Sequence, residues 1–181
     1  THPEVWPEVQ LMERCGPRFG DALMSRVPYQ ELLFPGGSME AVLPVYEDAV
    51  LAAFCNGCVV AAVATVCVLL PSNTRVIALE VGAGSGGTAS SVLPVLDGSC
   101  ARYVFTDVSN IFLRQARVRF GEDFPFVEYA LLNIDADPRL QSFSSDHCDL
   151  IIATNVLHAT PSMHNTLRHC LQLLCQAGFL I

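Results

Sequence analysis

The hydrophobic pattern changes at residue 75, and from there short apolar runs alternate with amphipathic stretches. Apolar runs of strand length occupy residues 75–82, 102–109, 126–135 and 148–158, and another begins at Phe179. Stretches with helical periodicity occupy residues 86–96, 110–121 and 163–178. Strands that alternate with helices predict an α/β fold, in which a parallel sheet is covered by helices on both faces.

Residues 1–74 have a more irregular pattern. Short apolar pieces are separated here by Pro3, Pro7, Pro17, Pro28, Pro35 and Pro44. Residues 3–16 and 20–27 predict short helices, and Ser38 predicts the N-cap of a helix that begins at Met39. We therefore predict an N-terminal helical lid or packing region over residues 1–74 and a Rossmann-like core over residues 75–181.

The last predicted strand begins at Phe179, and the sequence ends at Ile181. Parallel sheets of this kind normally continue beyond a fifth strand. We therefore expect the C-terminal strands of the domain to lie outside this sequence.

Residues 49–70 carry no charge and are long enough to span a bilayer. Asn56 and Gly57 interrupt this stretch, and basic residues do not flank it closely. We favour a helix buried in a soluble domain, and a membrane-spanning helix is the alternative.

Composition excludes several functions. The net charge of -8 disfavours nucleic acid as the main partner, because phosphate backbones attract concentrated positive charge. All ten basic residues are arginine, so mechanisms that need a lysine are excluded, including the phosphate-binding lysine of P-loops and Schiff-base catalysis.

Eight cysteines without a secretory signal pattern predict a reducing, cytoplasmic location. For Cys55 and Cys58, spaced C-x-x-C, we favour core packing over a redox or zinc site. His164 and His169 lack the i, i+4 spacing of metal ligands, so we expect surface residues and no metal site.

The most informative stretch is "ALEVGAGSGGTASS", residues 78–91, between a predicted strand and a predicted helix. Its four glycines are Gly82, Gly84, Gly86 and Gly87, and three of them form the pattern G-x-G-x-x-G. Glycines in this context permit a tight turn and let a ligand approach the backbone at the positive end of a helix. The spacing alone is weak evidence, because strand-to-helix turns also use glycine for packing.

Three further residues sharpen this interpretation. Asp107 ends the next predicted strand, where a carboxylate can accept hydrogen bonds from both ribose hydroxyls. Glu80 precedes the glycines in an E-x-G-x-G arrangement, and Thr88 offers a hydroxyl at the helix start. An acidic residue there suits a ligand with an ammonium and a sulfonium, such as S-adenosylmethionine, better than a dinucleotide pyrophosphate. A pyridine-nucleotide reductase and a turn without a ligand are the alternatives.

With these residues in view, the chain resembles the C-methyltransferase domains of modular polyketide synthases. The motifs that carry the resemblance are "ELLFPGGS", "FCNG", "LEVGAGSGGTASSVLPVL", "YVFTDVSNIFLRQARVRF", "NVLHAT" and "TLRHCLQLL". The resemblance implies a class I methyltransferase fold that uses S-adenosylmethionine to methylate the α-carbon of a β-ketoacyl chain on an acyl carrier protein. It also implies neighbouring synthase domains as partners.

The same resemblance implies roles for individual residues. The loop from Glu80 to Gly87 would hold the methionine part of the cofactor, and Asp107 would hold the ribose. Asn133 and Ile134 would border the adenine, Asn155 would lie beside the methionine part or the substrate, and His158 would be the catalytic base. A histidine suits removal of an acidic α-proton, because its side chain titrates near neutrality.

The sequence departs from the family pattern in three places, and one of them is Asn133, where the family more often has an aspartate. The glutamate that orients the family's histidine would fall soon after Ile181. Phe54 stands where the family commonly has a tyrosine, and Tyr46, on the same predicted helix, is a candidate substitute. A non-catalytic structural remnant and O- or N-methylation are the alternative functions, although the retained glycine loop, Asp107 and His158 favour an active ancestry.

Overall fold

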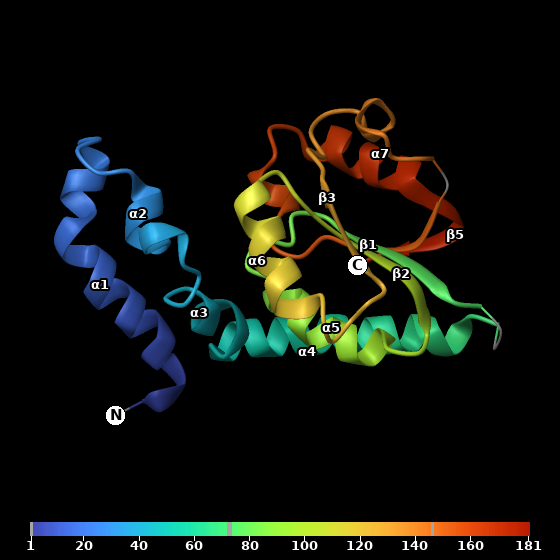
Figure 1. Cartoon of the computed structure of the whole chain (residues 1–181), viewed down its shortest axis with the longest axis horizontal. Helices are drawn as coiled ribbons and strands as arrows, with labels where there is room; N and C mark the ends of the chain where they lie inside the picture. The colour runs from blue at the N-terminus through green and yellow to red at the C-terminus, as the bar shows by residue number, and fades with distance from the viewer. Residues whose placement is uncertain (1, 72–73, 146) are drawn as a thin grey trace. The chain divides into compact units, whose positions relative to one another are not determined.

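The computed structural model describes residues 2–71, 74–145 and 147–181 (Figure 1). The chain divides into two compact units, Thr1–Cys58 and Val59–Ile181, and this boundary falls inside one long helix. The predicted division after residue 74 lies closer to the first strand, which begins at Val76. Residue 74 therefore lies where the chain changes from helix to strand. That the domain boundary also lies there stays a prediction.

The first unit is built from helices. Its elements are η1 (Pro3–Val5), α1 (Trp6–Leu23), α2 (Tyr29–Leu33), η2 (Pro35–Gly37), α3 (Leu43–Glu47) and the beginning of α4 (Val50–Leu69). The two short helices predicted in 3–16 and 20–27 are wrong as separate elements, because α1 continues through Pro17. The fixed φ of proline lies close to the helical value, so Pro17 removes one backbone donor without forcing the chain out of the helix.

The predicted helix start at Met39 is also wrong. Ser38 Oγ accepts a hydrogen bond from Glu40 N at 3.2 Å, which closes a local turn instead of a helix. Helix α3 begins at Leu43, with Pro44 in its first turn. Proline suits that position because the first N–H groups of a helix have no partner within it.

Helix α4 forms over the uncharged stretch, but most of its surface is exposed. Among the described residues, α4 is the one helix long and apolar enough to cross a membrane. In its apolar 18-residue stretch, 22% of the residues are buried. Val59, Val63 and Val66 form its buried stripe. The expectation of a buried helix is therefore wrong for most of α4, and core packing is wrong for Cys55 and Cys58, which are exposed.

The second unit contains a five-stranded sheet in the order β3-β2-β1-β4-β5, and every neighbouring pair is parallel. The strands are β1 (Val76–Glu80), β2 (Cys100–Asp107), β3 (Val127–Leu131), β4 (Cys148–Ile152) and β5 (Leu174–Leu180). The connecting helices are α5 (Gly87–Leu96), α6 (Asn110–Phe120), η3 (Pro138–Gln141), η4 (Leu157–Ala159) and α7 (Met163–Leu173). The predicted alternation of strands and helices is confirmed.

Helices cover both faces of this sheet, as the pattern predicts. One face packs with residues of α4, α5 and α6, such as Val63, Leu93 and Phe120. The other face packs with α7 through Cys170 and Leu173 (Figure 1). The carboxyl ends of all strands in a parallel sheet lie at the same end of the sheet. The loops after β1, β2, β3 and β4 are therefore on the same side of the unit.

The boundary between the last helix and the last strand differs from the prediction. Helical periodicity predicts a helix up to Gly178, whereas α7 ends at Leu173 and β5 begins at Leu174. Leu174 is extended and pairs with Cys148, and Ala177 takes a positive φ of 65°. Pairing with β4 therefore overrides the local helical preference in this segment.

Candidate functional site

The loop after β1 packs tightly against the segment after β4. Gly82 has a φ of +60°, and a Cβ built on it would lie 2.3 Å from Val156 Cγ2. A side chain at this position would therefore be strained by the backbone and blocked by Val156. The first glycine of the pattern is explained by packing, without any ligand.

The second glycine has a different environment. Gly84 has a φ of +54°, and a Cβ built on it would meet only Gly82 O, at 3.9 Å. Its N–H donates a hydrogen bond to Asp107 Oδ2 at 3.0 Å, which joins the loop to the end of β2. Packing within the chain thus leaves open space beside Gly84, where a ligand can approach the backbone.

Asp107 is buried at the carboxyl end of β2, with 5% of its surface exposed. Its Oδ1 accepts a second backbone hydrogen bond, from Ser109 N at 2.8 Å. Burial raises the pKa of this carboxyl, while the hydrogen bonds from Ser109, Gly84 and Val108 oppose that rise. An ionised carboxylate has about four lone-pair directions, so beside these three backbone donors about one remains for a further donor such as a ribose hydroxyl.

The start of α5 is tied to the neighbouring strands. Ala83 N donates to Thr106 O at 2.8 Å, and the Thr88 and Thr154 hydroxyls share a hydrogen bond of 2.8 Å. Thr88, at the helix start, is therefore paired with the segment after β4. Helix α5 begins at Gly87, so its first N–H groups face this edge of the sheet.

Glu80 lies beneath the loop, with 1% of its surface exposed. Tyr103 Oη donates a hydrogen bond to Glu80 Oε2 at 2.7 Å, while Glu80 Oε1 has no hydrogen-bond partner among the described residues. Burial raises the pKa of Glu80 to about 7, against the lowering effect of Tyr103, and the nearby Asp107 charge raises it further. The carboxyl therefore changes its charge near neutral pH.

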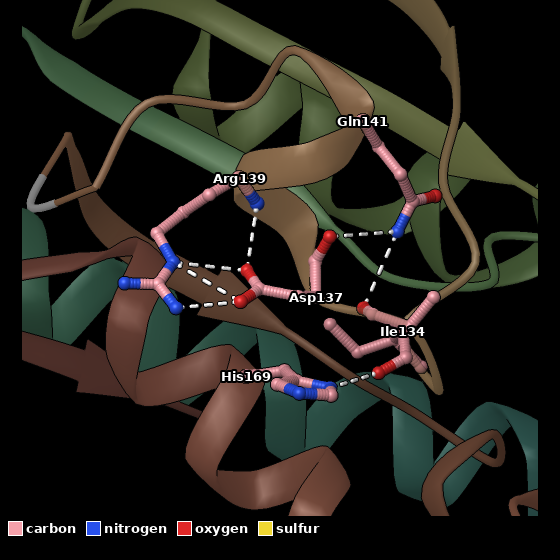
Figure 2. Close-up of polar contacts among 6 residues, drawn as sticks. Ile134, Asp137, Arg139, Gln141 and His169 are labelled. Carbon is pink, nitrogen blue, oxygen red and sulfur yellow. Dashed lines mark hydrogen bonds and ion pairs between the residues drawn. The ribbon is translucent and has the colours of Figure 1, made fainter.

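The segment after β3 is held by side chains from elsewhere in the sequence. Asn133 is exposed, and the side chain of Ile134 is buried in the cluster beneath α7. Figure 2 shows Gln141 and His169 directed at this segment, with His169 Nδ1 at 2.7 Å from Ile134 O. His169 is 5% exposed, so the expectation of a surface residue is wrong for it, whereas His164 is exposed as expected.

The segment after β4 carries the two remaining predicted site residues. Asn155 is exposed and has a positive φ of 53°, a conformation that asparagine tolerates better than most residues. His158 is exposed on η4. Thr160 Oγ1 donates to Leu157 O at 2.7 Å and accepts from Thr166 Oγ1 at 2.9 Å, which links this turn to α7.

Residues 79–180, which run from within β1 to the end of β5, match a family described as a methyltransferase domain. This chain belongs to the methyltransferase domain family.

Similar proteins indicate the kind of enzyme in which this methyltransferase domain occurs. Polyketide synthase ThaG of Burkholderia thailandensis is 40% identical over 164 residues, which are 89% of this chain and 3% of ThaG. The solved carbon methyltransferase CurJ is 36% identical with a TM-score of 0.93, and the match covers 99% of this chain and 47% of CurJ. The trans-methyltransferase CalH, solved in complex with SAH, is 32% identical with a TM-score of 0.82, over 98% of this chain and 48% of CalH.

The methyltransferase domain thus spans about half the length of these solved structures and a small part of ThaG. Its class I methyltransferase fold and its relation to polyketide synthases are confirmed.

The structure brings some of the predicted site residues into direct contact. Gly84 N donates to the Asp107 carboxylate, and Leu132 N donates to the Asp107 backbone carbonyl at 3.1 Å, so the segment that carries Asn133 starts beside the same residue. Gly82 contacts the segment that carries Asn155 and His158 through Val156. Glu80 lies below these residues, buried in the unit.

Phe54 and Tyr46 belong to the first unit and lie on different helices, α4 and α3, so the expectation of a shared helix is wrong. The physical reason is the break between Glu47 and Val50, which separates the two helices. Asn56 Nδ2 spans this break by donating to Tyr46 O at 3.1 Å.

Sequence patterns did not identify Tyr103, Thr154 or Gln141 as parts of the site. Tyr103 could have been found by alternation, because Tyr103, Phe105 and Asp107 share one face of β2. His169 also had a signal, because its spacing from Thr166, Cys170 and Leu173 places it on the buried face of α7. Gln141 and Thr154 act through loop geometry, which leaves no periodic signal.

Proposed function

We propose that this methyltransferase domain binds S-adenosylmethionine and methylates the α-carbon of a β-ketoacyl thioester carried by an acyl carrier protein, within a polyketide synthase. The observation that carries the proposal is the link between Gly84 and Asp107, with open space on the loop and room on the carboxylate for a further donor. The likeness to the carbon methyltransferase CurJ and to CalH with SAH supports the choice of ligand and of a carbon acceptor.

The residues at the edge of the sheet fit the proposed cofactor. Asp107 can accept a hydrogen bond from a ribose hydroxyl without giving up its backbone donors, among them Gly84 and Ser109. The loop around Gly84 would hold the methionine part, and the segment of Asn133 and Ile134 would border the adenine. Buried acid at Glu80 and Asp107 favours a ligand with positive charge nearby.

S-adenosylmethionine would supply an electrophilic methyl group. His158 would remove the α-proton of the substrate: the proton goes to an imidazole nitrogen, and the electron pair stays on the α-carbon and is delocalised onto the ketone oxygen. The exposed position of His158 on η4 leaves it accessible to a substrate delivered from outside the domain. Asn155, which precedes it after β4, would orient the methionine part or the substrate.

The test compares cofactor binding with methyl transfer in the complete protein. Calorimetric titration with S-adenosylmethionine, and separately with NADPH, measures affinity, and mass spectrometry of a carrier-bound β-ketoacyl thioester measures methylation. We expect Asp107→Asn to weaken S-adenosylmethionine binding about 30-fold, since it removes charge-assisted hydrogen bonds. We expect His158→Ala to lower the methylation rate about 10²–10⁴-fold with nearly unchanged affinity.

His164→Ala is the matched control, because His164 is another exposed histidine and lies on the neighbouring α7. It should leave both quantities unchanged. Binding of NADPH instead of S-adenosylmethionine would favour a reductase, and binding of neither would favour a structural remnant. Full activity in His158→Ala would withdraw its role as the base and reopen O- or N-methylation.

A further inference from the structure

We propose that Gln141 and His169 are positioning residues that fix the backbone of the adenine-binding segment, residues 133–134. The inference rests on the proposed function, which places adenine beside this segment. The two residues come from η3 and α7, so neither is part of a cofactor-binding motif in the sequence.

Gln141 binds both sides of Asn133. Its Oε1 accepts from Asn133 N at 2.8 Å, and its Nε2 donates to Asn133 O at 2.8 Å and to Ala136 O at 3.2 Å. The side-chain amide thereby forms the pair of bonds that a neighbouring strand would form. The Gln141 amide takes the place of a missing strand here, because β3 is the outermost strand of the sheet and Asn133 lies beyond its last paired residue, Leu131.

His169 holds the next residue from the opposite direction (Figure 2). Its Nδ1 lies 2.7 Å from Ile134 O, and because a carbonyl oxygen only accepts, Nδ1 carries the proton and donates. The ring is buried on α7, and the Ile134 side chain packs in the cluster that contains Cys170 and Leu173. Ile134 is therefore fixed through both its carbonyl and its side chain.

The turn that follows is closed by its own polar side chains. Asn133 Oδ1 accepts from Asp135 N at 3.0 Å, and Asp137 accepts from the backbone and the guanidinium of Arg139. The hydrogen bonds from Arg139 lower the pKa of Asp137 to about 2, so this turn keeps its charge pair across the physiological range. The segment thus has a defined path before a ligand binds, which reduces the conformational entropy lost on binding.

The experiment compares two ligands that differ only in the base. S-adenosylhomocysteine and S-inosylhomocysteine are titrated into the complete protein, with wild type, Gln141→Met, His169→Leu and His169→Asn. We expect wild type to prefer the adenine ligand. Gln141→Met and His169→Leu should weaken that ligand about tenfold, as expected for loss of a hydrogen bond that fixes the site, and should change the hypoxanthine ligand less than about threefold.

His169→Asn is the rescue variant, because an asparagine amide can donate from nearly the position of the histidine Nδ1. It should restore the preference for adenine. His164→Leu is the matched control, since it makes the same change at an exposed position of α7.

Four outcomes would overturn the inference. Equal weakening of both ligands would show a general loosening of the unit, and unchanged affinities would show that neither residue positions the base. A wild-type protein that binds both ligands equally would place base recognition elsewhere and leave the proposed function intact. Failure of wild type to bind either ligand would overturn the proposed function itself, and this inference with it.

Discussion

The loop after β1 and the segment after β3 both lie at the carboxyl edge of the sheet, but they are shaped in opposite ways. The first depends on side chains that are missing, because Gly82 has no room for a Cβ beside Val156 and Gly84 leaves space open. The second depends on side chains that are present, because Gln141 and His169 bind the backbone of residues 133–134.

The difference explains why one region can be recognised from the sequence and the other cannot. Glycines that serve a loop lie within the loop, so they form a local pattern. The partners of residues 133–134 lie on η3 and α7, and they approach only when the unit has folded. A site at one edge of a sheet thus combines a local motif with contacts that only the tertiary structure reveals.

A side chain added to the loop after β1 should have the largest effect. Gly82→Ala adds a Cβ only 2.3 Å from Val156 Cγ2 at a positive φ, so we expect a loss of about 3 kcal/mol or more in the free energy of unfolding. Gly84→Ala meets open space and should lose only about 1 kcal/mol from backbone strain. Denaturant unfolding of both variants measures the difference.

Val156→Ala supplies the control for the steric explanation. Combined with Gly82→Ala, it should restore part of the lost stability, because it removes the clashing Cγ2. The rescue should be incomplete, because Val156 Cβ still lies 3.1 Å from the new Cβ. The two glycines should also differ in their effect on cofactor affinity. Gly84→Ala should weaken the binding of S-adenosylmethionine far more than its small loss of stability implies. Similar stability losses in the two alanine variants would contradict the division of roles.

The carboxyl beneath the glycine loop gives a second, smaller test. Burial raises the pKa of Glu80 from 4.5 to about 7, so the folded protein holds this proton more tightly than the unfolded chain does. The resulting stability is present below pH 4.5 and is lost as the pH rises towards and through 7. Relative to Glu80→Gln, wild type should lose about 2 kcal/mol between pH 5.5 and 7.5.

Unfolding free energies at several pH values test this difference. Tyr103→Phe should steepen the loss, because the Tyr103 hydroxyl stabilises the ionised form of Glu80. Glu122→Gln, a change of an exposed carboxyl in the same unit, is the control for charge alone. A parallel pH dependence of wild type and Glu80→Gln would show that Glu80 does not titrate in this range.

Most of the second unit could be predicted from the sequence, because its strands and helices each have the period of their own class. The contacts of Gly84 with Asp107 also follow from a known spacing, since the carboxyl ends of neighbouring parallel strands adjoin. The start of β5 could not be predicted in the same way. Residues 174–177 continue a helical period, whereas in the structure Leu174 pairs with Cys148 of β4 and Ala177 takes a positive φ.

Burial was harder to predict than secondary structure. Cys55 and Cys58 are apolar residues in an apolar helix, and composition does not say which face of α4 contacts the core. The spacing of His169 from His164 carries no information on burial, whereas its place on the buried face of α7 does. In both cases the missing information is the direction of a helix face, which neighbouring elements determine.

The smallest expected effect tests whether α7 also positions the turn that carries His158. Thr166 is fully buried, and its hydroxyl donates to Thr160 Oγ1 at 2.9 Å, with Ser162 O at 3.0 Å as an alternative acceptor for the same proton. Thr166→Val keeps the shape and removes these bonds, so we expect about 1 kcal/mol of lost stability and a methylation rate lowered a few-fold at unchanged cofactor affinity. Thr65→Val is the matched control, because Thr65 makes a similar hydroxyl bond to Ala61 O from an exposed position of α4. A weaker cofactor affinity in Thr166→Val, with its rate at saturation unchanged, would assign Thr166 to the segment after β3 and leave the turn of His158 without a support from α7.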